Sequence, residues 1–252
     1  MANGAPKDWP SSGHISFEGV EVKYRPETDL VLKKISFEVE PGMKVGVVGR
    51  TGAGKSTIGL ALSRIMELQS GVIKIDKVDT SKISLQELRD NITFIPQDPV
   101  IFDDTLKFNL DPTGKISEDT LKDLVKEAGL DVLLKSESLD RKFTDAGASL
   151  SAGERQLICI CRAILRKNKV VVLDEATSNI DVVTELATQK LIEKSFTEST
   201  VFTIAHRINT IIKSDKVMVL DQGKLAEFDK PEILLQDQKS MFNRLVSEML
   251  KD

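Results

Sequence analysis

Hydrophobic and polar residues largely alternate over two segments near the start of the sequence, residues 15–24 and 35–39. A period of two predicts strands that bury one face. Residues 45–48 are apolar throughout, which is typical of a strand covered on both faces. Further short apolar runs predict strands at 170–173, 200–204 and 216–220.

Helical spacing replaces this alternation elsewhere. Apolar residues recur every three or four positions from Ile58 to Met66, directly after a glycine-rich segment. They do so again from Leu121 to Ala128, after the candidate N-cap Ser117. Strands that alternate with helices on both sides of a mainly helical middle predict an α/β core with a helical insertion.

This pattern divides the chain into four expected parts. Residues 1–13 are rich in Gly, Pro, Ser and Asn, and we expect a flexible lead-in. The first part of the core then covers residues 14–96 and the helical subdomain residues 97–166. The second part of the core covers residues 167–252.

Composition narrows the class of protein. The chain has 252 residues, with 35 Lys and Arg against 39 Asp and Glu, and a formal net charge of −4. This mildly acidic balance does not favour a nucleic-acid binder, and no long uncharged apolar segment predicts a membrane-spanning helix. Residues 1–10 lack the apolar stretch of a secretory signal. Cys159 and Cys161, two positions apart, fit neither a disulfide framework nor a four-ligand metal site, so a reducing compartment is expected.

A glycine-rich loop carries the first candidate chemistry. Residues 49–56 read Gly-Arg-Thr-Gly-Ala-Gly-Lys-Ser, which fits the phosphate-loop pattern between a predicted buried strand and a predicted helix. Lys55 is positioned to reach the β- and γ-phosphates of a nucleotide, and the Ser56 hydroxyl to bind Mg²⁺. The alternative is a glycine-rich turn before a helix. The expected nucleotide contacts are Arg50, Thr51, Gly52, Ala53, Gly54, Lys55, Ser56 and Thr57.

Two carboxylates follow the apolar run at 170–173. Buried carboxylates are costly unless a charged partner lies opposite, so Asp174 is a candidate Mg²⁺ ligand and Glu175 a candidate base for an attacking water. The alternative is a strand that ends in two solvated acids. Because Asn168-Lys169 is followed by Val170 rather than by the rest of a guanine-reading motif, adenine is the favoured base.

Five further motifs, in order, resemble those of ATP-binding-cassette (ABC) ATPases. The segment 150–156, Leu-Ser-Ala-Gly-Glu-Arg-Gln, resembles the family's signature motif, and Tyr24 resembles its adenine-stacking aromatic residue. Gln97 resembles the Q-loop glutamine, residues 178–181 resemble the D-loop, and His206 resembles the switch histidine. The resemblance extends over nearly all of residues 14–250.

The resemblance implies a fold and a set of roles. The fold would be a RecA-like P-loop NTPase core with an antiparallel β subdomain and an inserted helical subdomain. The implied catalytic residues are Glu175, His206, Lys55 and Gln97. The implied Mg²⁺ ligands are Ser56, Gln97 and Asp174. Besides the phosphate loop, the implied ATP contacts are Tyr24, Ser151, Gly153 and Glu154.

The residues of four further segments indicate a particular branch of the family. Segments 9–13, 24–26, 96–102 and 108–112 resemble subfamily C, the multidrug-resistance-protein-like exporters, and Glu175 resembles their second nucleotide-binding domain. Four residues depart from the usual family pattern: Ala152 and Glu154 in the signature, Asn179 in the D-loop, and Cys161 before Arg162.

The resemblance implies an ATP-hydrolysing motor domain of an ABC exporter. Such a domain closes head to tail, in an ATP-dependent homo- or heterodimer, with a second nucleotide-binding domain. It works with transmembrane domains at the cytoplasmic face of a membrane, is soluble when isolated, and binds no nucleic acid. The alternatives are a regulatory module that binds ATP but barely hydrolyses it, and an ABC ATPase of DNA repair or translation. Retention of Lys55, Asp174, Glu175 and His206 argues against the first alternative, and the missing coiled-coil insertion or second cassette against the other.

Overall fold

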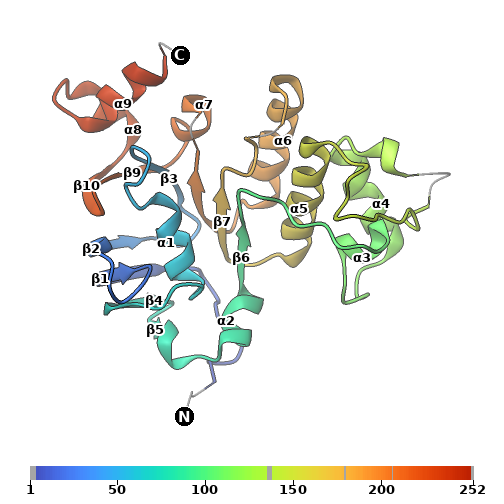
Figure 1. Ribbon diagram of the computed structural model, residues 1–252, viewed down its shortest axis with the longest axis horizontal. Helices are drawn as coiled ribbons and strands as arrows, with labels where there is room; N and C mark the ends of the chain where they lie inside the picture. Colours follow the sequence, from blue (N-terminus) through green and yellow to red (C-terminus); the bar gives the residue numbers. More distant parts are fainter. Residues whose placement is uncertain (1–3, 135–137, 179, 206, 251–252) are drawn as a thin grey trace. The chain divides into compact units, whose positions relative to one another are not determined.

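The computed structural model describes residues 4–134, 138–178, 180–205 and 207–250 (Figure 1). The chain forms two compact units. The core unit consists of Met1–Phe94, Asn168–Glu175 and Glu198–Asp252. The helical unit consists of Ile95–Lys167 and Ala176–Thr197. It thus includes a segment, Ala176–Thr197, that the sequence analysis assigned to the core.

The first sheet, of four strands, is antiparallel and has the order β2-β1-β4-β5. Its strands are β1 (Ile15–Lys23), β2 (Leu30–Val39), β4 (Ser70–Ile75) and β5 (Val78–Asp79). The predicted strand at 35–39 therefore begins five residues earlier. The structure confirms an antiparallel β part of the fold.

The second sheet has six strands in the order β10-β9-β3-β8-β7-β6, and β9, β3, β8 and β7 run parallel. Its strands are β3 (Lys44–Val48), β6 (Ile92–Ile95), β7 (Val170–Asp174), β8 (Thr200–Ile204), β9 (Lys216–Asp221) and β10 (Lys224–Asp229). All five residues of β7 are buried, as a strand covered on both faces requires. The predicted α/β core is confirmed.

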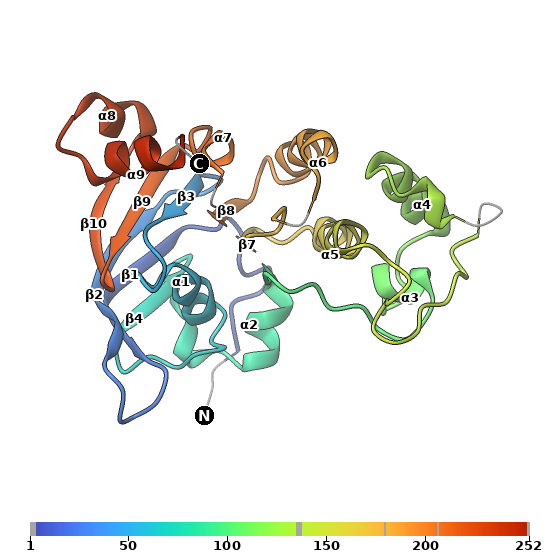
Figure 2. The ribbon, with the colours of Figure 1, turned by 45° about the horizontal axis from the view of Figure 1, so that its top comes forward.

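Helix α1 (Lys55–Leu62) packs against β2 of the first sheet and against β7 and β8 of the second, and Figure 2 shows it beside both. Residues of both sheets and of α1 share one hydrophobic core, in which the Phe17 and Phe37 rings stack at 4.4 Å. Gly59 allows α1 to approach β7 closely, since a Cβ there would lie 2.7 Å from Cγ1 of Val172. The core therefore holds α1 from two sides. The remaining core-unit helices are α2 (Leu85–Asn91), α7 (Ile208–Ile211), α8 (Pro231–Gln236) and α9 (Met241–Met249), with a 3₁₀ turn at Thr80–Lys82.

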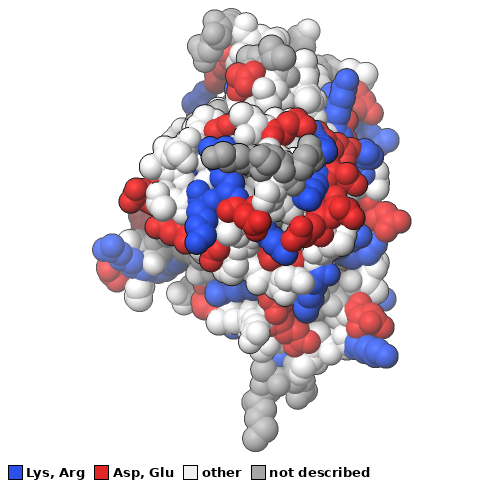
Figure 3. Space-filling view, turned by 90° about the vertical axis from the view of Figure 1, so that its right-hand side faces the viewer, with Lys and Arg blue, Asp and Glu red and all other residues white. Residues whose placement is uncertain are grey.

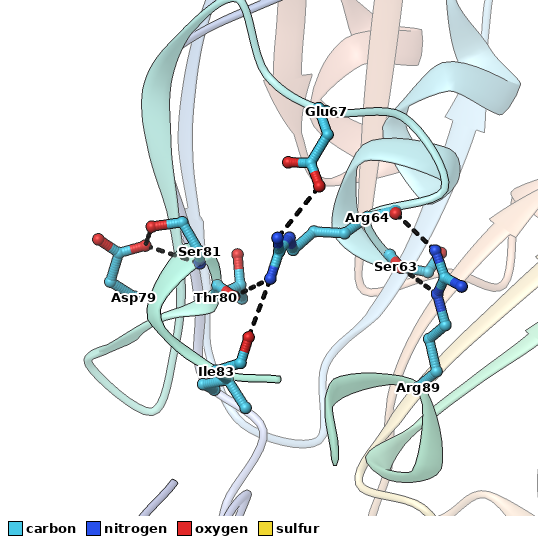
Figure 4. Close-up of polar contacts among 8 residues, drawn as sticks. All are labelled: Ser63, Arg64, Glu67, Asp79, Thr80, Ser81, Ile83 and Arg89. Carbon is cyan, nitrogen blue, oxygen red and sulfur yellow. Dashed lines mark hydrogen bonds and ion pairs between the residues drawn. The ribbon is translucent and has the colours of Figure 1, made fainter. Parts of the chain in front are cut away.

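Two arginines fix the end of α1 (Figure 4). Arg89, from α2, donates hydrogen bonds to the backbone oxygens of Ser63 (3.4 Å) and Arg64 (2.8 Å), which lie just beyond the last turn of α1. Arg64 donates in turn to the backbone oxygens of Thr80 (3.1 Å) and Ile83 (3.0 Å). Helix-terminal carbonyls have no partner within the helix, so the Arg89 guanidinium stabilises the end of α1 and joins it to α2. The Arg64 guanidinium joins the same end to the 3₁₀ turn.

The segment before β1 is attached to the core. Trp9 is 7% exposed and donates a hydrogen bond from Nε1 to the Ile75 oxygen at 2.9 Å. The Asp76 carboxylate accepts backbone hydrogen bonds from Ser12 (2.8 Å), Gly13 (3.0 Å) and His14 (2.8 Å). Burial by itself raises the pKa of Asp76, but these bonds and the Ser12 hydroxyl outweigh it and hold the pKa below its usual value. No local pattern in the sequence predicts these contacts, which join residues more than 60 positions apart.

The helical unit contains α3 (Leu106–Leu110), α4 (Glu118–Glu127), a 3₁₀ turn at Asp131–Leu133, α5 (Ala152–Arg166) and α6 (Val182–Ser195). Helix α5 packs against both α3 and α6. In Figure 3, basic and acidic side chains are interspersed over the face in view. Within the described part of the chain, no helix is long and apolar enough to cross a membrane.

Candidate nucleotide-binding site

The phosphate loop connects the buried strand β3 to α1, as the sequence predicts. Gly54, the residue before the helix, adopts φ +101°, and a Cβ there would lie 2.9 Å from Cδ2 of Leu32 in β2. A Cβ on Gly49 would collide with the Leu220 backbone oxygen. Positive φ and close approach therefore require glycine at these two positions. The first backbone N–H groups of α1 have no partner within the helix, which makes this end of α1 suited to an anion.

Lys55, the first residue of α1, folds back across the loop. Its Nζ donates hydrogen bonds to the backbone oxygens of Gly49 (2.7 Å) and Arg50 (3.2 Å). Burial lowers the pKa of Lys55, while the charges of Glu175 and Asp174 act in the opposite direction. The structure therefore brings the predicted lysine into the electrostatic field of both predicted carboxylates.

The two carboxylates come from the end of β7. Asp174 is the last residue of the strand and is 6% exposed, whereas Glu175 is half-buried. Glu175 adopts φ +50°, which is unusual for a residue other than glycine, and its N–H donates to the Ile204 oxygen of β8 at 2.8 Å. The backbone thus changes direction between the two acids. Carboxylate oxygens suit Mg²⁺ as ligands. Ser56, whose hydroxyl is another predicted Mg²⁺ ligand, directly follows Lys55 in α1 and is half-buried.

Tyr24 follows β1 and is 59% exposed. Its hydroxyl lies 3.1 Å from Oγ1 of Thr57, a residue of α1 that is 1% exposed. Both residues belong to the predicted ATP contacts. Separate motifs in the sequence predicted a role for each residue, but no sequence pattern predicted that the two residues contact one another.

The signature residues lie in the helical unit, at the start of α5. Ser151 is the N-cap of α5, and its Oγ accepts a hydrogen bond from the Glu154 N–H at 3.1 Å. The Glu154 carboxylate accepts one from the Ser151 N–H at 2.7 Å, which completes a capping box. Gly153 is the second residue of α5. The departure at Glu154 therefore places a negative charge in the first turn of this helix.

Among the other residues singled out from the sequence, the structure describes Gln97 and Arg50. Gln97 is exposed and lies just after β6, in the helical unit. His206 and Asn179 lie outside the described residues. Arg50 forms an exposed ion pair with Glu248 of α9 at 3.3 Å, which the sequence analysis missed because no local pattern links the two.

A glycine-rich loop between a parallel strand and a helix, a lysine at the helix start and an acidic pair after a neighbouring strand define a P-loop nucleoside-triphosphate-binding protein. Residues 32–178 match the family described as ABC transporter, which is more than half of the chain. The chain belongs to the ABC transporter family.

The chain is also similar to individual proteins. It is 48% identical to the Caenorhabditis elegans multidrug resistance protein mrp-7 over 95% of the chain and 16% of that protein. It is 45% identical to the Saccharomyces cerevisiae metal resistance protein YCF1, over 96% of the chain and 16% of that protein. It is 47% identical to the Rattus norvegicus ATP-binding cassette sub-family C member 2, over 94% of the chain and 16% of that protein. The chain therefore spans about a sixth of the length of these relatives.

One solved structure similar to the chain is that of a bacterial Atm1-family ABC exporter with ATP bound. The TM-score is 0.91 and the identity 30%, and the match covers 100% of this chain and 44% of the exporter chain. These comparisons confirm the P-loop fold and the likeness to subfamily C exporters.

Proposed function

We propose that this chain is the ATP-hydrolysing motor domain of a membrane exporter, equivalent to the second nucleotide-binding domain of a subfamily C transporter. The observation that carries the proposal is the placement of Lys55 at the start of α1, in the field of the Asp174–Glu175 pair. A lysine and two carboxylates are the groups that a phosphoryl-transfer site needs, because the reaction depends on charge stabilisation and on the orientation of water.

The phosphate loop binds the triphosphate. On nucleotide binding, the Lys55 ammonium exchanges its bonds with the Gly49 and Arg50 oxygens for the β- and γ-phosphates. Ser56, Asp174 and Gln97 would hold Mg²⁺, because hydroxyl, carboxylate and amide oxygens are the ligands that this ion prefers. When bound, Mg²⁺ neutralises the charge that the phosphates share.

Glu175 acts as the base. Its carboxylate accepts a proton from a water whose oxygen attacks the γ-phosphorus, while the bond from that phosphorus to the β–γ bridging oxygen breaks. ADP and phosphate are the products. His206 contacts the γ-phosphate and helps to orient this water, and Gln97 relays the state of the nucleotide.

The helical unit supplies a second phosphate-binding surface. Ser151 and Gly153 lie at the start of the 15-residue helix α5, and a helix N-terminus attracts anions. We place them opposite the γ-phosphate of an ATP held by a second nucleotide-binding domain, so that ATP joins two domains head to tail. Transmembrane domains of the parent transporter, at the cytoplasmic face of its membrane, would respond to this closure.

The test is MgATP turnover across a range of protein concentrations, with Glu175→Gln as the catalytic variant. Glu232→Gln, at an exposed position on α8, is the matched control. We expect a specific rate that rises with protein concentration, is lost in Glu175→Gln and is unchanged in Glu232→Gln. Tight binding without turnover would place the complementing signature on a different domain. Failure to bind MgATP, or parent-level turnover in Glu175→Gln, would contradict the proposal.

A further inference from the structure

The contact between Tyr24 and Thr57 joins two elements of the core unit that are 33 residues apart in sequence. Tyr24 stands where β1 ends, and Thr57 lies in the first turn of α1. The Thr57 hydroxyl is buried and needs a hydrogen-bond partner, because burying an unsatisfied hydroxyl costs free energy. Tyr24 provides that partner at 3.1 Å. Most of the Tyr24 side chain nevertheless stays exposed.

The base of the β1–β2 hairpin is fixed against the phosphate loop. Leu32 of β2 approaches Gly54 so closely that a Cβ on the glycine would lie 2.9 Å from it, and the Val31 oxygen would lie 3.2 Å away. The connection after Tyr24 bonds internally: the Thr28 N–H and hydroxyl both donate to the Arg25 oxygen, at 3.1 and 2.9 Å. The Tyr24 hydroxyl adds a hydrogen bond between this part of the hairpin and α1.

We propose that Thr57 is a positioning residue for the nucleobase: its hydroxyl holds the Tyr24 ring in the orientation in which the ring stacks on adenine. This inference rests on the proposed function and extends it from the phosphates to the base. A ring anchored at its hydroxyl and exposed over most of its surface can contact a base without first losing orientational freedom, which lowers the cost of binding. Thr57 thereby acts on the base through Tyr24.

Two ligands separate this role from a phosphate contact. MgATP carries a base, whereas inorganic tripolyphosphate with Mg²⁺ presents the phosphate chain alone. We expect Tyr24→Phe and Thr57→Val each to weaken MgATP binding about threefold to tenfold, the size of one net hydrogen bond. Tripolyphosphate binding should remain within about twofold of the parent chain. Thr57→Ser, which keeps the hydroxyl, should restore MgATP affinity.

A double-mutant cycle supplies the decisive comparison. Because both substitutions remove the same bond, the double variant should lose no more MgATP affinity than the weaker of the two single variants. Losses that multiply, or a Thr57→Val variant that loses tripolyphosphate affinity equally, would overturn the proposal. Thr57→Ala provides a second hydroxyl deletion if the valine variant folds poorly. A parent chain that binds MgATP no better than tripolyphosphate would also overturn it, whereas failure to bind either ligand would contradict the proposed function itself.

A spectroscopic measurement reports the contact directly. Tyr24 is the only tyrosine in the chain, so labelling tyrosine with ¹³C at Cζ gives one assigned NMR resonance. We expect Thr57→Val to shift this resonance in the nucleotide-free chain and Thr57→Ser to return it toward the parent position. An unchanged resonance in Thr57→Val would show that the hydroxyl makes no such bond.

Discussion

The Nζ atom of Lys55 lies 2.7 Å from the backbone oxygen of Gly49, so the first residue of α1 closes the phosphate loop onto its own start. The bond keeps the ammonium at the loop although burial lowers its pKa. A triphosphate offers the same ammonium several charged oxygens, and charge-assisted hydrogen bonds are stronger than those to neutral carbonyls. We therefore expect nucleotide binding to replace the two carbonyl acceptors of the Lys55 ammonium by charged phosphate oxygens, which form stronger hydrogen bonds.

Lys55→Ala tests this exchange. We expect MgATP affinity to fall about a hundredfold, because the variant loses the charge that faces the β- and γ-phosphates. Titration calorimetry measures the change. Lys190→Ala, at an exposed position on α6, serves as the control and should bind like the parent chain. Near-parent affinity in Lys55→Ala would contradict the assignment.

Glu154→Gln tests the altered signature. The glutamate carboxylate adds a negative charge at the start of α5, where we place the γ-phosphate of a partner's ATP. Glutamine can still complete a capping box, so the stability of the chain should change little. We expect ATP-dependent dimerisation, measured by light scattering in the Glu175→Gln background, to strengthen about threefold to tenfold.

Asp131→Asn removes a carboxylate from an exposed position elsewhere in the helical unit and is the matched control. It should leave dimerisation unchanged. Equal effects of the two substitutions would show that general charge, rather than the position of Glu154, determines the association.

Asp76→Asn tests the attachment of the segment before β1. The pKa of Asp76 is held below its usual value in the folded chain. The ionised Asp76 carboxylate therefore contributes its full stabilisation at pH values above the pKa that Asp76 has in the unfolded chain. This stabilisation is lost as pH falls through the pKa that Asp76 has in the folded chain. We expect the variant to lose about 1–3 kcal/mol of stability near neutral pH and less as pH falls below about 4.

Urea unfolding at several pH values, followed by the fluorescence of Trp9, measures this effect. Trp9 is the only tryptophan in the chain and is buried beside the same turn. Asp29→Asn, at an exposed position in the β1–β2 connection, is the control. The prediction is wrong if the stability difference between Asp76→Asn and the parent chain does not depend on pH.

Arg89→Ala tests the capping of α1 by α2. Loss of the guanidinium bonds to the Ser63 and Arg64 oxygens should lower the free energy of unfolding by about 1–2 kcal/mol. MgATP affinity should stay within about threefold, because the phosphate loop is at the other end of α1. For the stability comparison, Arg50→Ala removes an exposed ion pair and should cost less than about 0.5 kcal/mol. A larger loss in Arg50→Ala than in Arg89→Ala would reverse this ranking.

Most of the core elements and the phosphate-binding residues were predictable from local pattern. An apolar run followed by a glycine-rich loop, Lys55 and an amphipathic stretch could form a strand, a loop and a helix with little reference to the rest of the chain. The Asp174–Glu175 pair was equally predictable, because it directly follows a run of four apolar residues, which are buried in the structure. The predicted roles of these residues, and the predicted domain boundaries, stay predictions.

The sequence by itself determined several of the core strands, helix α1 and the motif residues proposed for the phosphate chemistry, because periodicity and short motifs act over a few neighbouring positions. Only the tertiary structure decided the strand order, the attachment of Trp9 and Asp76, and the contact between Tyr24 and Thr57. These features join residues that lie tens of positions apart. Such pairs meet only when strand register and core packing bring them within hydrogen-bonding distance, and no pattern along the chain encodes that distance.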